Sequence, residues 1–333
     1  MRWLMTHKQE QDSERGAAGI LAAVMMLVLL GAGAIAVDVG QMYAERAELQ
    51  NAADAGALAG AEICSVAGGC AQADAETVAA LLANQNSKDG RSNVRFVDLS
   101  VAEEVTVGTS TINGATGSSF LSKLFANALP NSPEVSVGAS ATAYWWYPTR
   151  GRSVLPLTFA TCEFIDDGLP HKILTQGGGH GAVDCNGVNP SNQIIPGGFA
   201  WLAPDGNTGC EVTAEVGQWS QTSAGASMPT GCDALFNTDL VGQTVAIPVY
   251  EYTCDGVLSP CTGSNVKYMI EKWAGFEVQG WKFPGNSYDP TSVFDTSEKG
   301  LYGTFVGYSA DPSIFTGGTS TPTGNVTVKG LKR

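Results

Sequence analysis

The sequence predicts an α+β fold in which a long N-terminal helix precedes a small sheet and a larger β-rich region. Three observations lead to this class. A run of 22 residues without a charged side chain, Gly16–Val37, continues into a proline-free amphipathic pattern that reaches Ile63. Apolar and small polar residues alternate over Val135–Trp145, as in a half-buried strand. Glycine and proline then recur too often in Arg152–Arg333 for long helices.

The run Gly16–Val37 is long enough to cross a membrane, because an α-helix needs about 20 apolar residues to span the hydrocarbon core. A buried core helix is a poor alternative, since the run is apolar on all sides. A cleaved signal peptide is the stronger rival, because Ala34-Ile35-Ala36 has the form of a cleavage site. The apolar part of a signal peptide usually measures only about 7–15 residues. We therefore expect a retained anchor in the lipid bilayer.

The distribution of charge predicts how this anchor is oriented. Arg2, Lys8 and Arg15 precede the run, and only Arg46 follows it closely. Basic residues favour the cytoplasmic side. This predicts a single-pass protein of the cytoplasmic membrane with its N-terminus in the cytoplasm, Asp38 at the outer interface and most of the chain outside the cell. The net charge of −14 and the lack of a basic cluster argue against nucleic acid as a partner.

Eight cysteines follow the apolar run, an even number that is typical of an exported, disulfide-linked domain. Eight cysteines allow 105 connectivities, so spacing alone does not fix the pairing. Short separations suggest Cys64–Cys70 and Cys254–Cys261, and the simplest remaining pairs are Cys162–Cys185 and Cys210–Cys232.

The second half of the helix carries one stripe of small and apolar residues. It includes Leu49, Ala53, Gly56 and Gly60, and its two glycines have the spacing that lets helix backbones approach closely. Two interpretations are open. The stripe packs on the protein's own sheet, or it packs on helices of other subunits. Under the second interpretation, these four residues are the candidate helix-packing interface.

Several motifs of this helix resemble those of Tad (tight adherence, Flp-type) pilus-assembly proteins, most closely the TadG-like ones. They are Arg15-Gly16-Ala17, Ala36-Val37-Asp38-Val39-Gly40, and Leu49-Gln50-Asn51-Ala52-Ala53-Asp54-Ala55 followed by Ala57-Leu58-Ala59-Gly60-Ala61. The resemblance implies a non-enzymatic, membrane-anchored component of a pilus assembly system, either minor-pilin-like or a scaffold, with other Tad/Flp subunits as partners. The alternative is an adhesin or ligand-binding protein displayed on a membrane anchor. Leu21, where prepilins carry glutamate, favours an uncleaved anchor.

Four segments follow from these patterns. They are a cytoplasmic lead at 1–15, the helix at 16–63, a pilin-like α+β module at 64–148 and a β-rich extracytoplasmic domain at 152–333. The module is expected to hold a second helix beginning near Asp74, a strand at Val97–Val101, a short helix at Phe120–Asn127 and the strand at Val135–Trp145. In the C-terminal region the strand candidates are Val154–Phe159, Thr244–Tyr252, Val266–Ile270, Trp273–Phe283 and Leu301–Tyr308.

Catalytic and metal-binding patterns give no positive signal. His171, His180, Asp184 and Cys185 are residue types that bind zinc, but their spacing matches no common zinc site, and Cys185 is expected to be oxidised. The G-x-S-x-G and phosphate-binding loop motifs do not occur. We expect no enzymatic activity, no cofactor and no metal.

Overall fold

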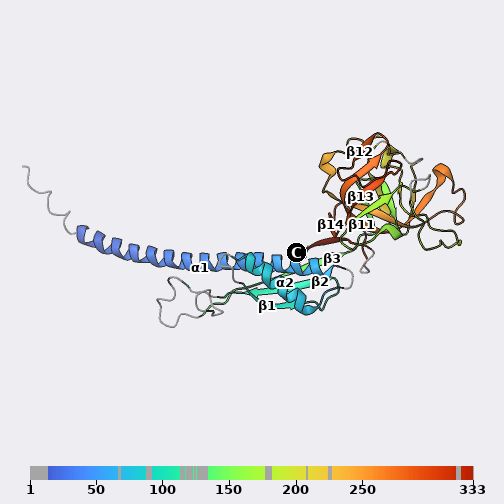
Figure 1. Ribbon diagram of the computed structural model, residues 1–333. Helices are drawn as coiled ribbons and strands as arrows, with labels where there is room; N and C mark the ends of the chain where they lie inside the picture. Colours follow the sequence, from blue (N-terminus) through green and yellow to red (C-terminus); the bar gives the residue numbers. More distant parts are fainter. Residues whose placement is uncertain are drawn as a thin grey trace, which may run out of the picture. The chain divides into compact units, whose positions relative to one another are not determined.

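The computed structural model describes residues 14–66, 69–87, 92–112, 117, 123, 125, 134–176, 182–207, 209–223, 227–319 and 324–332. It confirms the α+β class, with a long apolar N-terminal helix followed by a β-rich region that holds four disulfides (Figure 1). The chain divides into two compact units, which are described separately. The first comprises Met1–Gly60, Gln72–Leu99 and Val105–Thr142, and the second Ala61–Ala71, Ser100–Glu104 and Ala143–Arg333.

Helix α1 (Glu14–Cys64) is a single helix of 51 residues, one residue longer at its C-terminal end than the sequence predicts. At about 1.5 Å per residue it is roughly 75 Å long. The hydroxyl of Ser65, the residue after the helix, donates a hydrogen bond to the carbonyl of Glu62 in the last helical turn. Gly69, a few residues later, has a φ of 70°. The absence of proline and the abundance of alanine explain why nothing interrupts the helix earlier.

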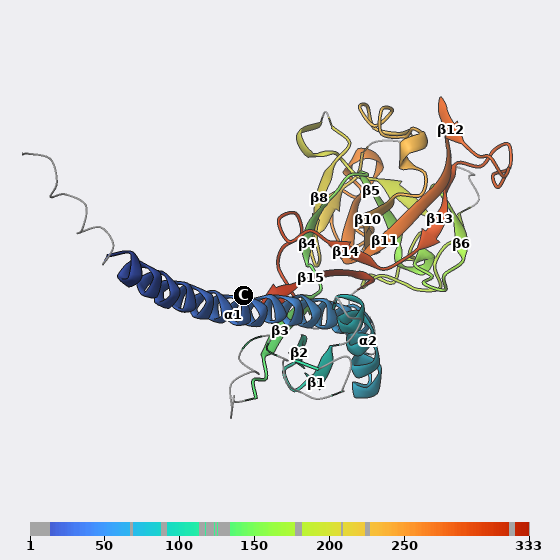
Figure 2. The ribbon, with the colours of Figure 1, turned by 90° about the vertical axis from the view of Figure 1, so that its left-hand side faces the viewer.

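In the first unit, two helices cover one face of a small sheet (Figure 2). Three buried alanines of the second helix, Ala75, Ala79 and Ala83, form its packing face, and their small size allows a close approach. The amide of Gln72 donates to the carbonyl of Val97 at 2.7 Å, which fixes this helix on the first strand. The elements beside α1 are α2 (Gln72–Gln85) and, in sheet order, β1 (Asn93–Asp98), β2 (Glu104–Ser110) and β3 (Gly138–Trp146).

The predicted strand at Val97–Val101 is wrong in its second half. Strand β1 ends at Asp98, and the chain then turns, with Glu103 at a φ of 56°, into the antiparallel strand β2. The alternation of Leu99 and Val101 belongs to this turn, whereas the alternation that faces the helices lies in β2, at Val105 and Val107. The short helix expected at Phe120–Asn127 lies almost wholly outside the described residues.

The second unit is built on an eight-stranded sheet in which β11 is the longest strand, with 17 residues. The order of the hydrogen-bonded strands in this sheet is β6-β13-β11-β10-β5-β7, and β9 and β12 also pair with β11. Outside this sheet, β4 pairs with β8, and β14 pairs with β15 in parallel. The strands are β4 (Arg150–Ser153), β5 (Leu157–Ala160), β6 (Pro170–Leu174), β7 (Phe199–Trp201), β8 (Val212–Glu215), β9 (Trp219–Gln221), β10 (Thr244–Thr253), β11 (Lys267–Phe283), β12 (Asn286–Tyr288), β13 (Gly300–Phe305), β14 (Tyr308–Ala310) and β15 (Val326–Lys332). Short 3-10 turns lie at Thr161–Glu163, Asp205–Asn207, Thr238–Leu240 and Gly263–Asn265.

This sheet is buried on both faces. On β10, Val245, Ile247 and Val249 point into one hydrophobic core, while Ala246 and Tyr250 point into a second. Strands that are covered on both sides appear in a sequence as continuous apolar runs. This explains why β10 is predicted almost to the residue.

The two strand candidates Val266–Ile270 and Trp273–Phe283 are one strand, β11. Glu271 and Lys272 interrupt the apolar pattern in the sequence, and the register with β10 shifts at Glu271, between the pairs Lys272–Val249 and Ile270–Tyr250. The strand nevertheless continues through this irregularity. The side chains of Glu271 and Lys272 lie 3.3 Å apart as an ion pair. Charge inside a strand therefore marks a partly exposed position here, and not an end.

Four disulfides join neighbouring cysteines along the chain. They are Cys64–Cys70, Cys162–Cys185, Cys210–Cys232 and Cys254–Cys261, the same pairs that spacing suggests. In the chain-entropy model, closing loops of 22 or 23 residues stabilises the fold by about 3 kcal/mol each.

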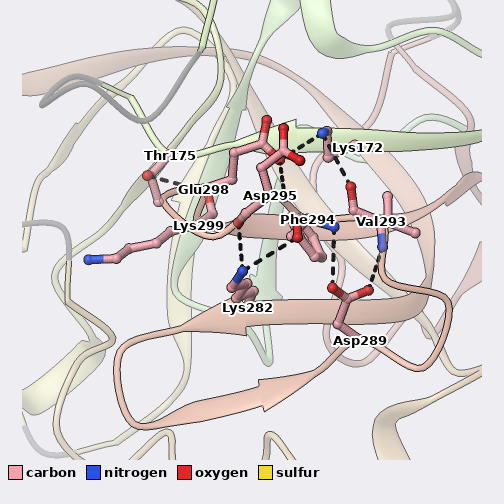
Figure 3. A network of polar contacts seen from close by, with 9 residues as sticks. All are labelled: Lys172, Thr175, Lys282, Asp289, Val293, Phe294, Asp295, Glu298 and Lys299. Carbon is pink, nitrogen blue, oxygen red and sulfur yellow. Dashed lines mark hydrogen bonds and ion pairs between the residues drawn. The ribbon is translucent and has the colours of Figure 1, made fainter.

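A polar network holds the segment between β12 and β13 against two strands (Figure 3). Lys172 of β6 contacts the carboxylate of Glu298 at 2.7 Å, and that carboxylate also accepts the backbone amide of Asp295. Lys282 of β11 donates to the carbonyl of Asp295. The carboxylate of Asp289 accepts the backbone amides of Val293 and Phe294 at 2.8 and 3.2 Å. The loop is therefore fixed by charge-assisted hydrogen bonds at both ends.

This network predicts a pH dependence of stability. The hydrogen bond from Lys172, followed by the amide of Asp295, lowers the pKa of Glu298 below its ordinary value of 4.5. A carboxyl group whose pKa is lowered by folding stabilises the fold above its unfolded pKa and loses this effect as pH falls through the folded pKa. Chemical denaturation from pH 7 to pH 3 is expected to give a smaller loss of stability for Lys172→Met than for the wild type.

Lys299→Met is the matched control, because Lys299 lies next to the same loop but has no ion-pair partner within the described residues. It is expected to keep the wild-type pH profile. An equally weakened pH dependence of stability in both variants would show that this dependence does not come from the Lys172–Glu298 contact.

Candidate functional site: the N-terminal helix

The first half of α1 is an aliphatic surface that no described part of the protein covers. An 18-residue window of this helix has a mean hydropathy of 2.7, and none of it is buried. Large side chains such as Leu27 and Leu30 are 74% and 69% exposed. Exposed apolar surface of this extent is unfavourable in water. It makes this part of α1 a candidate membrane span.

Polar chemistry begins at the residue after this surface. Asp38 is only 7% exposed, and its carboxylate accepts the backbone amide of Phe125 at 3.1 Å. Lys123, two residues before Phe125, is also buried. A buried carboxylate is costly unless it is hydrogen-bonded. Phe125 thus contacts α1 at the position where the helix changes from apolar to amphipathic.

The second half of α1 packs on the protein's own module. Leu49, Ala53, Gly56 and Gly60 are all buried, and they face β2 and α2 of the first unit. The hydroxyl of Thr109 on β2 donates to the carbonyl of Leu49 at 2.9 Å. In this structure these four residues are buried against the protein's own module.

The two glycines are required by this internal packing. A Cβ on Gly56 would lie 3.1 Å from the carbonyl oxygen of Ala79 and 3.3 Å from Val107, and one on Gly60 would lie 2.8 Å from Val105. At Gly56 the close neighbour is the backbone of α2 of the same chain, and at Gly60 it is the side chain of Val105 on β2.

A different face of α1 stays open. Tyr43, Ala47, Asn51 and Leu58 are exposed and recur at spacings of four and seven, so they lie along one side of the helix. We call these four residues the exposed stripe. The sequence gives only a weak signal for it, because alanine and asparagine do not stand out as contact residues. Tyr43, 72% exposed just beyond the apolar surface, is the one conspicuous member.

The residues considered for zinc do not form a metal site in the described part of the chain. Cys185 is bonded to Cys162, and His171 is 2.8 Å from Asp167, whose pKa is lowered chiefly by this hydrogen bond. His180 lies outside the described residues. Among the described residues, no three metal-ligating side chains come together.

Comparison with known proteins identifies the helix. The family model described as "Putative Flp pilus-assembly TadE/G-like" matches residues 16–67, which include the aliphatic surface, the buried stripe and the turn after α1. No curated protein and no solved structure matches the chain. The chain thus carries an N-terminal Tad domain of the TadE/G-like type. This domain supports an involvement in Flp pilus assembly and an association with the membrane and with pilus-assembly components.

Proposed function

We propose that this protein is a non-enzymatic, membrane-anchored component of a Tad/Flp-type pilus assembly system, with a minor-pilin-like or scaffold role. The observation that carries the proposal is the division of α1 within the Tad segment. Its first half anchors the chain in the cytoplasmic membrane. Its second half is the spine of a small α/β module and keeps one side free for other subunits.

The orientation follows the charge distribution and the cysteines. The N-terminus lies in the cytoplasm, and both units lie outside, where four disulfides persist. Asp38 then lies at the outer membrane interface, where its carboxylate accepts the backbone amide of Phe125. The second unit faces outward as a rigid, disulfide-linked body.

The exposed stripe is the surface through which α1 contacts other subunits. Its four side chains are exposed, so substitutions there are expected to separate function from folding. The double variant Ala47→Arg/Asn51→Arg is expected to abolish piliation in a strain that depends on this protein, while protein level and membrane localisation stay unchanged. Electron microscopy of surface pili measures the first, and immunoblotting of membrane fractions the second.

The matched control is Thr77→Arg/Leu81→Arg, which places the same two charges four residues apart on the exposed face of α2. It is expected to leave piliation intact. Normal piliation in the stripe variant would contradict the proposal. If that variant instead lost adhesion while pili were normal, display of an adhesin on a membrane anchor would be the better account.

A further inference from the structure

We propose that the first unit binds the phosphate of an anionic lipid headgroup in a pocket formed by Arg46, Arg95 and Phe96, at the end of the module nearest the membrane. The pocket measures about 330 Å³ and is lined by α1, β1, β2 and β3. The inference rests on the proposed function, because it requires that the first half of α1 is in the bilayer and that the module lies outside.

The charge of the pocket points to an anion. Two guanidinium groups line it, and its lining contains no carboxylate. Within the described residues neither Arg46 nor Arg95 has an ion-pair or hydrogen-bond partner. By contrast, Arg150 and Arg152 of the second unit are paired with Glu215 and Glu211. In a chain with a net charge of −14, two adjacent unpaired arginines form a local cationic site.

The remaining lining fits a phosphodiester with an apolar end. Gln50 and Ser140 are further polar residues of the lining. The ring of Phe96, 47% exposed, lies over Gly108, where a side chain would leave it no room. Arginine suits phosphate because its planar group offers two parallel donors, and the exposed ring offers a surface for the glycerol and first methylene groups of a lipid.

The position along α1 favours a lipid over a soluble phosphate. Arg46 lies nine residues beyond Val37, an axial rise of about 14 Å, and helical side chains lean toward the N-terminus of their helix. The headgroup layer extends about 5–8 Å beyond the hydrocarbon core, so the guanidinium can reach it. Tyr43 lies between Val37 and Arg46 on the helix and is exposed. Aromatic residues are enriched at this level, the membrane interface.

Lipid selection by the full-length protein tests this proposal. The purified chain is equilibrated in detergent micelles that contain phosphatidylcholine and a minority of phosphatidylglycerol. It is then purified again, and its bound lipid is quantified by mass spectrometry. We expect enrichment of phosphatidylglycerol by about fivefold for each arginine, and enrichment near onefold for Arg46→Gln/Arg95→Gln. The control Arg150→Gln/Arg152→Gln removes the same charge from the second unit and should keep the enrichment.

Three results would overturn the proposal. They are equal enrichment in the wild type and in Arg46→Gln/Arg95→Gln, equal loss in the control, and abolition of the enrichment by excess inorganic phosphate, which would identify a site for free anions. All four arginines are exposed, so unchanged thermal unfolding is expected throughout. The assay contains no pilus component, so its failure is distinct from a failure of the pilus-assembly proposal.

Discussion

Replacing Gly56 by leucine is expected to unfold the first unit while the second unit stays folded. The new side chain would meet the backbone carbonyl of Ala79, which is fixed inside α2, and the methyl group of Val107 on β2. Overpacking usually costs about 1–3 kcal/mol, and more where backbone has to move. A whole domain is stable by only about 5–15 kcal/mol. Loss of the packing of α2 on α1 should follow.

Two observables separate the units. Six of the seven tryptophans follow Ala143, so the thermal transition of tryptophan fluorescence reports on the second unit and should not change. Limited proteolysis between Gln72 and Ser110 reports on the first unit and should become rapid. The control is Gly40→Leu, on the same helix, where a Cβ meets nothing within 4 Å. Equal protease resistance in the two variants would refute the internal packing of Gly56.

Replacing Phe276 by alanine is expected to destabilise the second unit by about 3–5 kcal/mol. This ring is fully buried on β11, with ring centres at 5.2 Å from Phe159 and 5.1 Å from Phe305 in edge-on geometry. The substitution removes both aromatic contacts and leaves a cavity between β5, β11 and β13. The free energy of unfolding is measured by denaturant titration of the tryptophan signal.

A graded series strengthens this test. Phe276→Leu refills most of the volume and should cost less than the alanine variant. Leu169→Ala removes an exposed side chain from the same unit and should change stability by less than about 0.5 kcal/mol. A cost for Phe276→Ala no larger than that of Leu169→Ala would contradict the position of this ring in the core.

Most of the backbone architecture could be predicted from the sequence because its strongest signals are local. The uninterrupted helix, the doubly buried strand β10 and the paired neighbouring cysteines each depend on residues that are close in the chain. Short strands such as β7, β9 and β12 escape prediction, since three residues carry no period. The pairing of β7 with β5 and of β9 with β11 depends on contacts between distant segments, whereas β12 forms a tight hairpin with the end of β11.

The candidate site shows where local patterns reach their limit. Gly56 and Gly60 correctly signal close packing, but a sequence does not say whether the neighbour belongs to the same chain. The answer depends on where α2 and β2 lie. The exposed stripe escapes for the opposite reason, since Ala47 and Asn51 are ordinary solvent-facing residues until the fold shows which side of α1 is left open.

Photo-crosslinking in cells tests the central claim, that α1 faces its own module on one side and other pilus-assembly subunits on the other. A photoreactive phenylalanine analogue is placed at Ala47 or Asn51, and at Thr77 of α2 as the control. This probe leaves the eight paired cysteines undisturbed. The account predicts adducts with pilus-assembly subunits, identified by mass spectrometry, from the two stripe positions and none from Thr77. Adducts from neither stripe position, or equal adducts from all three, would contradict it.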